Sequence, residues 1–191
     1  MVSKTEIPSM INGVDRNKLF GTVDAVKDTP ELAKFTFKIH NEWLDGAHNR
    51  STIQTFFGAG TDFEHPVKFE LDADEPAVLL GQDQGPNSGE YLLHALAACV
   101  TTAMVYHAAA RGIAIEEVVS SIDGDIDLRG FLGIDPKVRN GFQEIRMNFR
   151  IKADVPDEQL QELCKIGQRY SPVLDSITHG VPVKIAAERM S

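Results

Sequence analysis

Residues 90–112 constrain the fold more than any other segment, because they are apolar on nearly every side that a helix can present. The segment reads EYLLHALAACVTTAMVYHAAARG and holds no glycine or proline before Gly112. It predicts a helix with Ser88 as its N-cap and Gly112 at its C-cap, just after Arg111. A helix this apolar is buried on nearly all sides. The chain must therefore wrap a sheet around it or bury it against a partner chain.

Charge and cysteine content narrow the functional classes. The 191 residues hold 19 Lys and Arg against 28 Asp and Glu, a net charge of −9. This balance argues against nonspecific binding to nucleic acid or to an anionic membrane. The N-terminus lacks a secretory signal, and the longest nearly apolar stretch, residues 95–106, is shorter than the roughly 20 residues of a membrane span. The two cysteines, Cys99 and Cys164, are too few to form the disulfide framework of a small secreted protein, so we expect a cytoplasmic protein.

The remaining pattern predicts an α+β fold with an antiparallel sheet, not a doubly wound one. Residues 1–18 are expected to form an N-terminal arm, partly helical at most, and residues 19–191 a single domain. Strands are predicted at residues 19–27, 32–40, 51–57, 67–72, 118–128, 143–153 and 181–190. Turns are predicted at 28–30 and 43–46, and loops at 73–89 and 129–142. A second, amphipathic helix is predicted at 157–170, with Pro156 before it and Pro172 helping to end it.

Cys99 is the candidate nucleophile, and two interpretations of it stay open. Its neighbours one helical turn away are small, and Thr102 adds a hydroxyl. A lone cysteine in an apolar helix is usually an inert, small hydrophobic residue. A reactive thiolate needs a nearby cation, and none lies within one turn on this helix. The cation would have to come from elsewhere in the structure.

Acidic and histidine residues near the helix start allow structural explanations. Glu90 suits a first helical turn, and nine residues of helix place it about 13.5 Å and about 900° from Cys99, on the opposite face. His94, four residues after Glu90, forms a common helical pair with it. His48 and His65 are interpreted as solvated surface residues. No metal-ligand spacing is present, and no metal or cofactor is predicted.

Three motifs together resemble the OsmC/Ohr family, the osmotically inducible and organic hydroperoxide resistance proteins. Residues 85–99, GPNSGEYLLHALAAC, resemble the family's cysteine-helix signature GPxPxELLLAALAAC. Residues 129–133 (RGFLG) and 141–145 (GFQEI) resemble a pair of motifs of the OsmC-like branch. Residues 171–173 (SPV) resemble the CPV that follows the second helix. The resemblance covers residue 19 to the C-terminus.

The resemblance implies a fold and a chemistry. The fold would be an α+β homodimer of intertwined chains, with antiparallel sheets around long central helices and active sites at the interface. Cys99 matches the peroxidatic cysteine, which attacks a hydroperoxide and becomes a sulfenic acid. Glu90 matches the glutamate of the OsmC-like branch, and Arg50 is the candidate for the arginine that polarises the thiol. In hydroperoxide resistance members the glutamate sits one residue earlier, where this chain has Gly89.

Ser171 stands where the family has its resolving cysteine, and a serine hydroxyl cannot form a disulfide. Cys164 lies two helical turns earlier, about 10.5 Å along the axis, and is interpreted as a core residue. The expected activity is therefore reduction of small organic hydroperoxides by Cys99, with an external thiol as reductant. The alternative is a dimer that binds a small apolar ligand without catalysis. A cysteine hydrolase is remote, because no histidine is placed near Cys99 by helical geometry.

Overall fold

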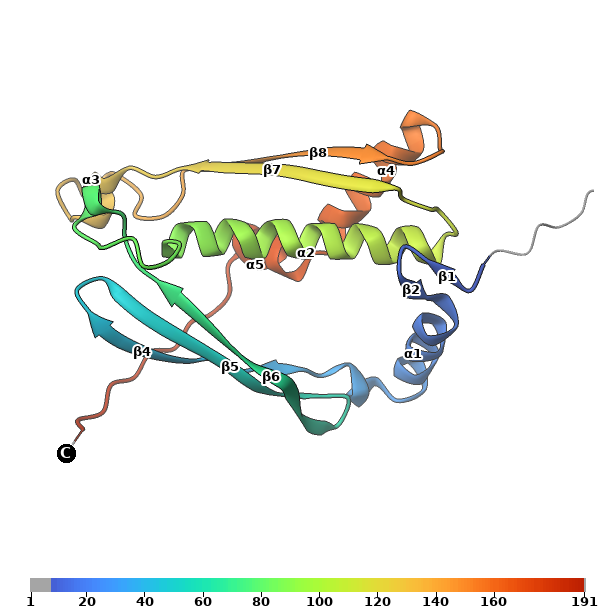
Figure 1. Ribbon diagram of the computed structural model, residues 1–191, viewed down its shortest axis with the longest axis horizontal. Helices are drawn as coiled ribbons and strands as arrows, with labels where there is room; N and C mark the ends of the chain where they lie inside the picture. The colour runs from blue at the N-terminus through green and yellow to red at the C-terminus, as the bar shows by residue number, and fades with distance from the viewer. Residues whose placement is uncertain (1–7, 191) are drawn as a thin grey trace, which may run out of the picture. The chain divides into compact units, whose positions relative to one another are not determined.

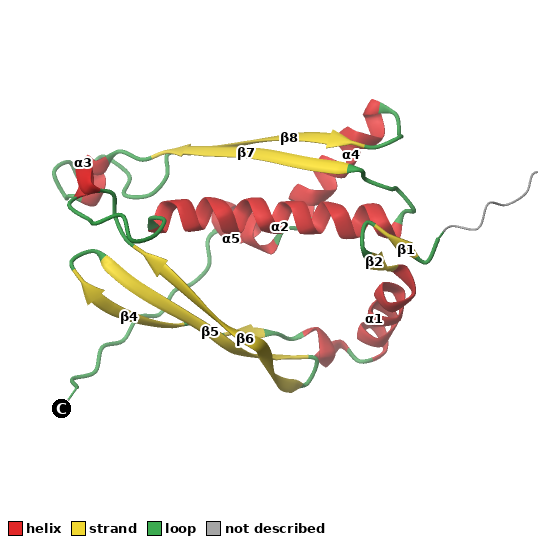
Figure 2. Ribbon diagram, in the orientation of Figure 1, coloured by secondary structure: helices red, strands yellow, loops and turns green. Residues whose placement is uncertain are grey.

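The computed structural model describes residues 8–190 and divides the chain into two compact units, Met1–His94 and Ala95–Ser191 (Figure 1). Each unit is described by itself. The elements are helices packed with antiparallel strands, which confirms the predicted α+β class (Figure 2).

The first unit begins with a short hairpin and a helix. Strands β1 (Met10–Ile11) and β2 (Val14–Asp15) pair with each other, and α1 (Arg16–Asp28) follows. The strand predicted at residues 19–27 is wrong. The carboxylate of Asp15 accepts hydrogen bonds from the backbone N–H groups of Asn17 and Lys18, and this N-cap starts a helix in place of the strand. Residues 1–7 of the predicted arm lie outside the described part of the chain.

A four-stranded antiparallel sheet forms the rest of this unit. The 3₁₀ turn η1 (Pro30–Ala33) leads to β3 (Thr36–Phe37), β4 (His40–Asp45), β5 (His48–Gly58) and β6 (Thr61–Ala73). Strand β5 lies in the middle, with β6 on one side and β3 and β4 on the other. The strands predicted at 51–57 and 67–72 are confirmed. The strand predicted at 32–40 is reduced mainly to β3. Three of the four residues of the turn predicted at 43–46 belong to β4, and only Gly46 lies in the turn.

Asp74 organises the loop that follows the sheet. It is only 3% exposed, and its carboxylate accepts hydrogen bonds from the backbone N–H groups of Glu75, Gln82 and Gln84. Burial alone raises the pKa of Asp74, but these three donors outweigh it and hold the pKa below its usual value. The turn η2 (Ala77–Leu79) lies between the bonded ends of the loop. Asp74 thus closes residues 75–84 into a compact loop directly before the next helix.

Helix α2 (Ser88–Ala110) confirms the helix predicted from residue 90 onward. Its length and its mean hydropathy of 1.4 are also compatible with a membrane span. The core helix of a soluble protein can have the same length and hydropathy. The expectation of burial on nearly all sides is not met within one chain. The buried residues fall on one stripe: Leu96, Val100, Met104, Ala108 and Ala109. Leu92 and Tyr106 remain exposed.

The second unit packs a hairpin and a helix against α2. Strands β7 (Glu117–Asp125) and β8 (Glu144–Lys152) pair antiparallel and run alongside α2 (Figure 1). Helix α4 (Asp157–Arg169) adds Leu163 to the core made by Met104 and Ala108. The apolar residues around this core come from both strands, from the chain before them and from α4: Ile113, Ile115, Val118, Phe149, Ile151 and Cys164. The loop predicted at 129–142 starts inside a short helix, α3 (Leu128–Phe131).

Gly167 allows α4 to approach α2 closely. A Cβ atom at this position would lie 2.9 Å from the backbone oxygen of Val100 and 3.1 Å from the Cβ of Met104. Real Cβ atoms essentially never show a contact as short as the first, and the second is shorter than most. The absence of a side chain therefore sets the distance between the two helices.

The C-terminal part of the chain corrects one further prediction. Helix α4 ends with Tyr170 as its cap, and Pro172, two residues beyond, begins a further helix, α5 (Pro172–His179). The strand predicted at 181–190 is wrong, since these residues have no regular secondary structure and make no ladder (Figure 2). Their alternating pattern finds no strand partner among the described residues of this chain.

Replacing Gly167 with alanine is expected to lower the free energy of unfolding by about 1–3 kcal/mol, because the added methyl must push α4 away from α2. Urea denaturation followed by circular dichroism measures the loss. Gly21 in α1 is the matched control, since nothing lies within 4 Å of a Cβ built there. Gly21→Ala should raise stability by about 0.5–1 kcal/mol. Equal effects of both substitutions would contradict the close helix contact.

Asp74→Asn is expected to lower the melting temperature at neutral pH, with a smaller deficit in acid. Because the pKa of Asp74 is lower in the folded protein than in the unfolded chain, its carboxylate stabilises the fold above the ordinary pKa of about 3.9. That contribution is lost as the pH falls through the folded value. Melting curves between about pH 6 and about pH 3 test this. The exposed Asp83→Asn is the control, and a deficit independent of pH would refute the role of the charge.

Candidate functional site

The start of α2 is fixed by a reciprocal pair of hydrogen bonds. The side-chain oxygen of Asn87 accepts from the backbone N–H of Glu90 at 2.8 Å, and the Glu90 carboxylate accepts from the backbone N–H of Asn87 at 2.8 Å. This is a capping box, with Asn87 in the capping position predicted for Ser88. Ser88 is instead the first residue of the helix. Glu90 therefore has a structural role whatever else it does.

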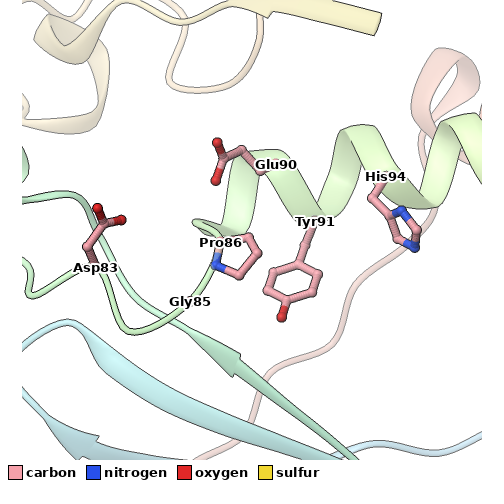
Figure 3. Close-up of a pocket in the computed structure, with 6 residues that line it drawn as sticks. All are labelled: Asp83, Gly85, Pro86, Glu90, Tyr91 and His94. Carbon is pink, nitrogen blue, oxygen red and sulfur yellow. The ribbon is translucent and has the colours of Figure 1, made fainter. Parts of the chain in front are cut away.

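An open hollow of about 540 Å³ lies beside this helix start (Figure 3). It is lined by Asp83, Gly85, Pro86, Glu90, Tyr91 and His94. Glu90 and Tyr91 leave the first turn of α2 on different sides, and His94 follows one turn later (Figure 3). The polar groups of the hollow are two carboxylates, a phenol and an imidazole. Such a set can hold hydrogen-bond donors and can exchange protons.

Tyr91 and Gly85 hold the loop against the end of β6. The Tyr91 hydroxyl donates a hydrogen bond of 2.7 Å to the backbone oxygen of Asp72. A Cβ at Gly85 would lie 2.3 Å from that same oxygen, so only glycine fits there. The hollow therefore rests on the edge of the sheet that carries Asp72.

The side chain of Asp72 gathers two basic residues from β5. Arg50 lies opposite Asp72 in the β5–β6 register and donates from Nε at 2.9 Å and from Nη2 at 3.1 Å. His48 Nε2 lies 2.9 Å from the same carboxylate. Hydrogen bonds from Arg50 and then His48 lower the pKa of Asp72, and the Asp72 bond raises the pKa of Arg50. The predicted surface histidine His48 is thus a partner in a polar cluster.

This cluster holds the guanidinium of Arg50 in one orientation. The two atoms Nε and Nη2 are occupied by the fork of Asp72. No described residue accepts a hydrogen bond from Nη1, which leaves one edge of the group available. A fixed guanidinium with an available edge is a preorganised site for negative charge.

Cys99 lies near the middle of α2 as a free, half-buried thiol. Because α2 runs without interruption from Ser88 to Ala110, Glu90 and Cys99 lie on opposite faces of it, as the helical arithmetic predicts. The structure therefore brings Glu90 to Asn87 and Arg50 to Asp72. It does not bring Glu90 to Cys99 within one chain.

Cys164 and Ser171 both serve the core of the second unit. Cys164 packs beside Met104, Ala108 and Leu163, which confirms its interpretation as a core residue, and burial raises the pKa of its thiol. Ser171 is only 2% exposed, and its hydroxyl oxygen accepts a hydrogen bond of 3.2 Å from the backbone N–H of Leu174. It is the N-cap of α5. A thiol with a raised pKa and a buried capping hydroxyl are poor reactive groups.

Sequence reasoning missed Asp72 and Tyr91 in this site. Asp72 ends a predicted strand, and its partners His48 and Arg50 lie more than twenty residues away, with no spacing that links them. His65 was interpreted as a solvated residue, but its ring lies 5.2 Å from that of Phe56 and 5.3 Å from that of Phe69. Between residues 8 and 190 no three His, Cys, Asp or Glu side chains are placed to hold a metal ion.

Solved structures of similar fold come from several bacteria. An OsmC-like protein of Mycoplasma pneumoniae is 17% identical, with a TM-score of 0.56 over 74% of this chain and 86% of that one. An organic hydroperoxide resistance protein OsmC of Legionella pneumophila is 17% identical, with a TM-score of 0.53 over 78% and 94%. An OsmC-like protein of unknown function from Vibrio cholerae is 12% identical, with a TM-score of 0.53 over 75% and 94%. At these identities the similarity concerns the fold.

A comparison with curated protein sequences finds no match. The family model described as OsmC-like protein matches residues 81–186, more than half of the chain. The matched region starts in the loop before α2 and includes the cysteine helix, both strands of the second unit and α4. The chain therefore belongs to the OsmC-like protein family.

Proposed function

We propose that this protein is a thiol-dependent peroxidase that reduces organic hydroperoxides through Cys99. The observation that carries the proposal is the free, half-buried thiol on α2, at the cysteine of the family signature. A solved protein of similar fold is named an organic hydroperoxide resistance protein. The two free thiols suit a cytoplasmic location, where reduced small thiols are abundant.

The reaction consumes one hydroperoxide and two external thiols. The Cys99 thiolate attacks the terminal peroxide oxygen, the O–O bond breaks, and the alkoxide leaves as the alcohol after taking a proton. Cys99 is then a sulfenic acid. One external thiol condenses with it, which releases water and leaves a mixed disulfide. A second thiol attacks that disulfide, releases the oxidised thiol pair and restores Cys99.

Two charged residues are proposed to support this chemistry. The available edge of Arg50 is suited to the thiolate and to the leaving oxygen, because Asp72 already fixes its orientation. Glu90 is suited to hold the proton or the hydroperoxide. Since Glu90 and Cys99 lie on opposite faces of α2, this role needs a second copy of the chain in the active site.

Mixing the reduced protein with cumene hydroperoxide is expected to produce sulfenic acid at Cys99 far faster than at free cysteine. Dimedone trapping and mass spectrometry measure the modified residue and its rate. Cys164→Ser should leave the rate unchanged, because the buried Cys164 thiol has a raised pKa and little thiolate. Cys99→Ser should abolish trapping. A rate at Cys99 no greater than that of free cysteine would exclude the peroxidase.

The same experiment with Glu90→Gln tests whether the Glu90 carboxylate takes part in the reaction. The glutamine keeps an oxygen for the backbone N–H of Asn87, so the capping box and the unfolding curve should be preserved. Loss of the carboxylate should slow sulfenate formation about 100-fold if Glu90 takes part in proton transfer. An unchanged rate would leave Glu90 with the capping role alone.

A homodimer is part of the proposal. In the first unit, Phe37, Phe56 and Phe63 lie side by side across three strands, with ring centroids 5.2–6.0 Å apart. Phe37 is 77% exposed and Phe63 43%, and a contiguous exposed group of aromatic rings is typical of an interaction surface. A second copy of the chain that covers these surfaces would bury both the aromatic rings and the exposed apolar side chains of α2. The same copy would bring a second Glu90 to the active site.

Phe37→Ser is expected to weaken the dimer at least tenfold while leaving the melting behaviour of the monomer nearly unchanged. The reason is that the Phe37 ring is exposed in one chain and would be buried only between two. Sedimentation equilibrium over a range of concentrations measures the dissociation constant. Val78→Ser is the control, because Val78 is 85% exposed and lies outside the aromatic row. A wild-type protein that stays monomeric at all concentrations would refute the dimer.

A further inference from the structure

Four residues at the ends of α2 and α4 form a compact group, here called the arginine–tyrosine cluster: His107, Arg111, Arg169 and Tyr170. The rings of His107 and Tyr170 stack, with centroids 4.3 Å apart and an angle of 24° between planes. Arg111 Nη1 lies 3.3 Å from His107 Nδ1 and donates to the His107 backbone oxygen at 3.0 Å. The Arg169 guanidinium carbon lies 5.4 Å from the centre of the Tyr170 ring. All four residues belong to the second unit.

The charge of this cluster is unbalanced. Neither Arg111 nor Arg169 forms an ion pair with any carboxylate in residues 8–190. Arg129 and Arg146, by contrast, contact one and three carboxylates. Arg111 lies at the His107 ring and Arg169 at the Tyr170 ring, so two guanidinium groups flank one stacked pair of rings. Guanidinium groups bind carboxylates in a planar, bidentate way, so an anion from solution fits this pair of positive charges.

His107 adds a donor without adding a charge. Burial, and then the neighbouring Arg111 charge, lowers the pKa of His107, so the ring is neutral at pH 7. In the neutral ring, Nδ1 accepts from Arg111, which leaves the proton on Nε2. No described residue takes a hydrogen bond from Nε2. The cluster therefore offers two positive charges and one neutral donor.

The cluster lies on the flank of α2 that leads to Cys99. His107 is eight residues beyond Cys99, which corresponds to about 12 Å along the helix and a rotation of about 80°. Ala103 lies between the two, at four residues from each, and carries only a methyl group on this flank. All three are half-buried positions of α2. A ligand held at the cluster would reach Cys99 along this flank, past the smallest side chain that a helix can place between them.

We propose that the arginine–tyrosine cluster binds the carboxylate of the small thiol that reduces the Cys99 sulfenic acid. The assignment of the ligand as a reductant rests on the proposed function, whereas the anion site rests on the cluster alone. The bound thiol attacks the Cys99 sulfur, the S–O bond breaks, and water leaves with the thiol proton. A second thiol molecule attacks the mixed disulfide and frees Cys99, so two thiols become one disulfide. The external thiol replaces the intramolecular partner that Ser171 cannot provide.

The first experiment tests the anion site without redox chemistry. Cys99→Ser protein is titrated with hexanoate and with hexanamide, and NMR follows the His107 ring. Hexanoate should shift the His107 signals and raise the pKa of His107, because a nearby negative charge favours its protonated form. Hexanamide should do neither. Arg169→Gln should weaken hexanoate binding about tenfold, and the exposed Arg150→Gln on β8 should leave it unchanged.

The second experiment tests the thiol. Preformed Cys99 sulfenic acid is mixed with 6-mercaptohexanoate or with 6-mercaptohexanamide, which differ only in charge at the far end. The carboxylate should reduce the wild-type protein about tenfold faster than the amide, and Arg169→Gln should abolish the difference. The Arg150→Gln variant should keep it.

Each result decides a different claim. Equal responses to hexanoate and hexanamide, or equal loss in Arg169→Gln and Arg150→Gln, would refute the anion site. Binding of hexanoate combined with equal rates for both thiols would refute the assignment of the ligand as reductant. Failure of Cys99 to form any sulfenic acid would refute the proposed function and the reductant together, while the first experiment would still decide whether the cluster binds carboxylates.

Discussion

The structure depends on the burial of one long apolar helix. Helix α2 presents apolar side chains around its whole circumference, and a single chain buries only the stripe that contains Val100 and Met104. Part of that burial is possible because Gly167 lets α4 approach the α2 backbone to a distance that no other residue permits. The β7–β8 hairpin adds the remaining contacts of this core. The unburied part of α2 is the physical reason for proposing a second copy of the chain.

Arginine side chains are used in two ways in this acidic protein. Arg50 is held in one orientation by the carboxylate of Asp72, whose two oxygens accept hydrogen bonds from two of the three guanidinium nitrogens. A residue held in this way loses little freedom when it stabilises a thiolate or a leaving oxygen. Within residues 8–190 no carboxylate pairs with Arg111 or Arg169, which lie at a stacked pair of rings instead. The first arrangement suits catalysis, and the second suits recognition of an anion from solution.

The two cysteines differ because their surroundings differ. Both thiols are partly buried, but Cys164 packs against a hydrocarbon core, and this burial raises the pKa of its thiol. Cys99 lies on α2 between Ala95 and Ala103. Ser171 follows α4 and caps α5 from a buried position. The replacement of a thiol by a hydroxyl at this point is compatible with the local structure, since a serine oxygen is a good acceptor for an N-terminal N–H group. The consequence for the proposed chemistry is that the second sulfur must come from outside the chain.

The fold class, α2, α4 and the strands at 51–57 and 67–72 could be predicted because periodicity and capping residues are local signals. The apolar residues of segment 19–27 predict a strand only when the cap at Asp15 is left out of account. The segment at 181–190 has the alternation of a strand, but no strand among residues 8–190 supplies hydrogen bonds to it, and a strand exists only as part of a ladder.

The candidate site likewise has features that could be predicted from the sequence and features that could not. The signature that ends at Cys99, the position of Glu90 and the serine at 171 are readable from the chain alone. The pairing of Arg50 with Asp72 depends on the register of β5 and β6, and the cluster around Tyr170 depends on how closely α4 meets α2. Signals between near neighbours in the chain are enough to predict α2, α4 and the candidate nucleophile Cys99. The pairing of Arg50 with Asp72 could not be predicted in this way, because the contact joins residues that are more than twenty positions apart in the chain.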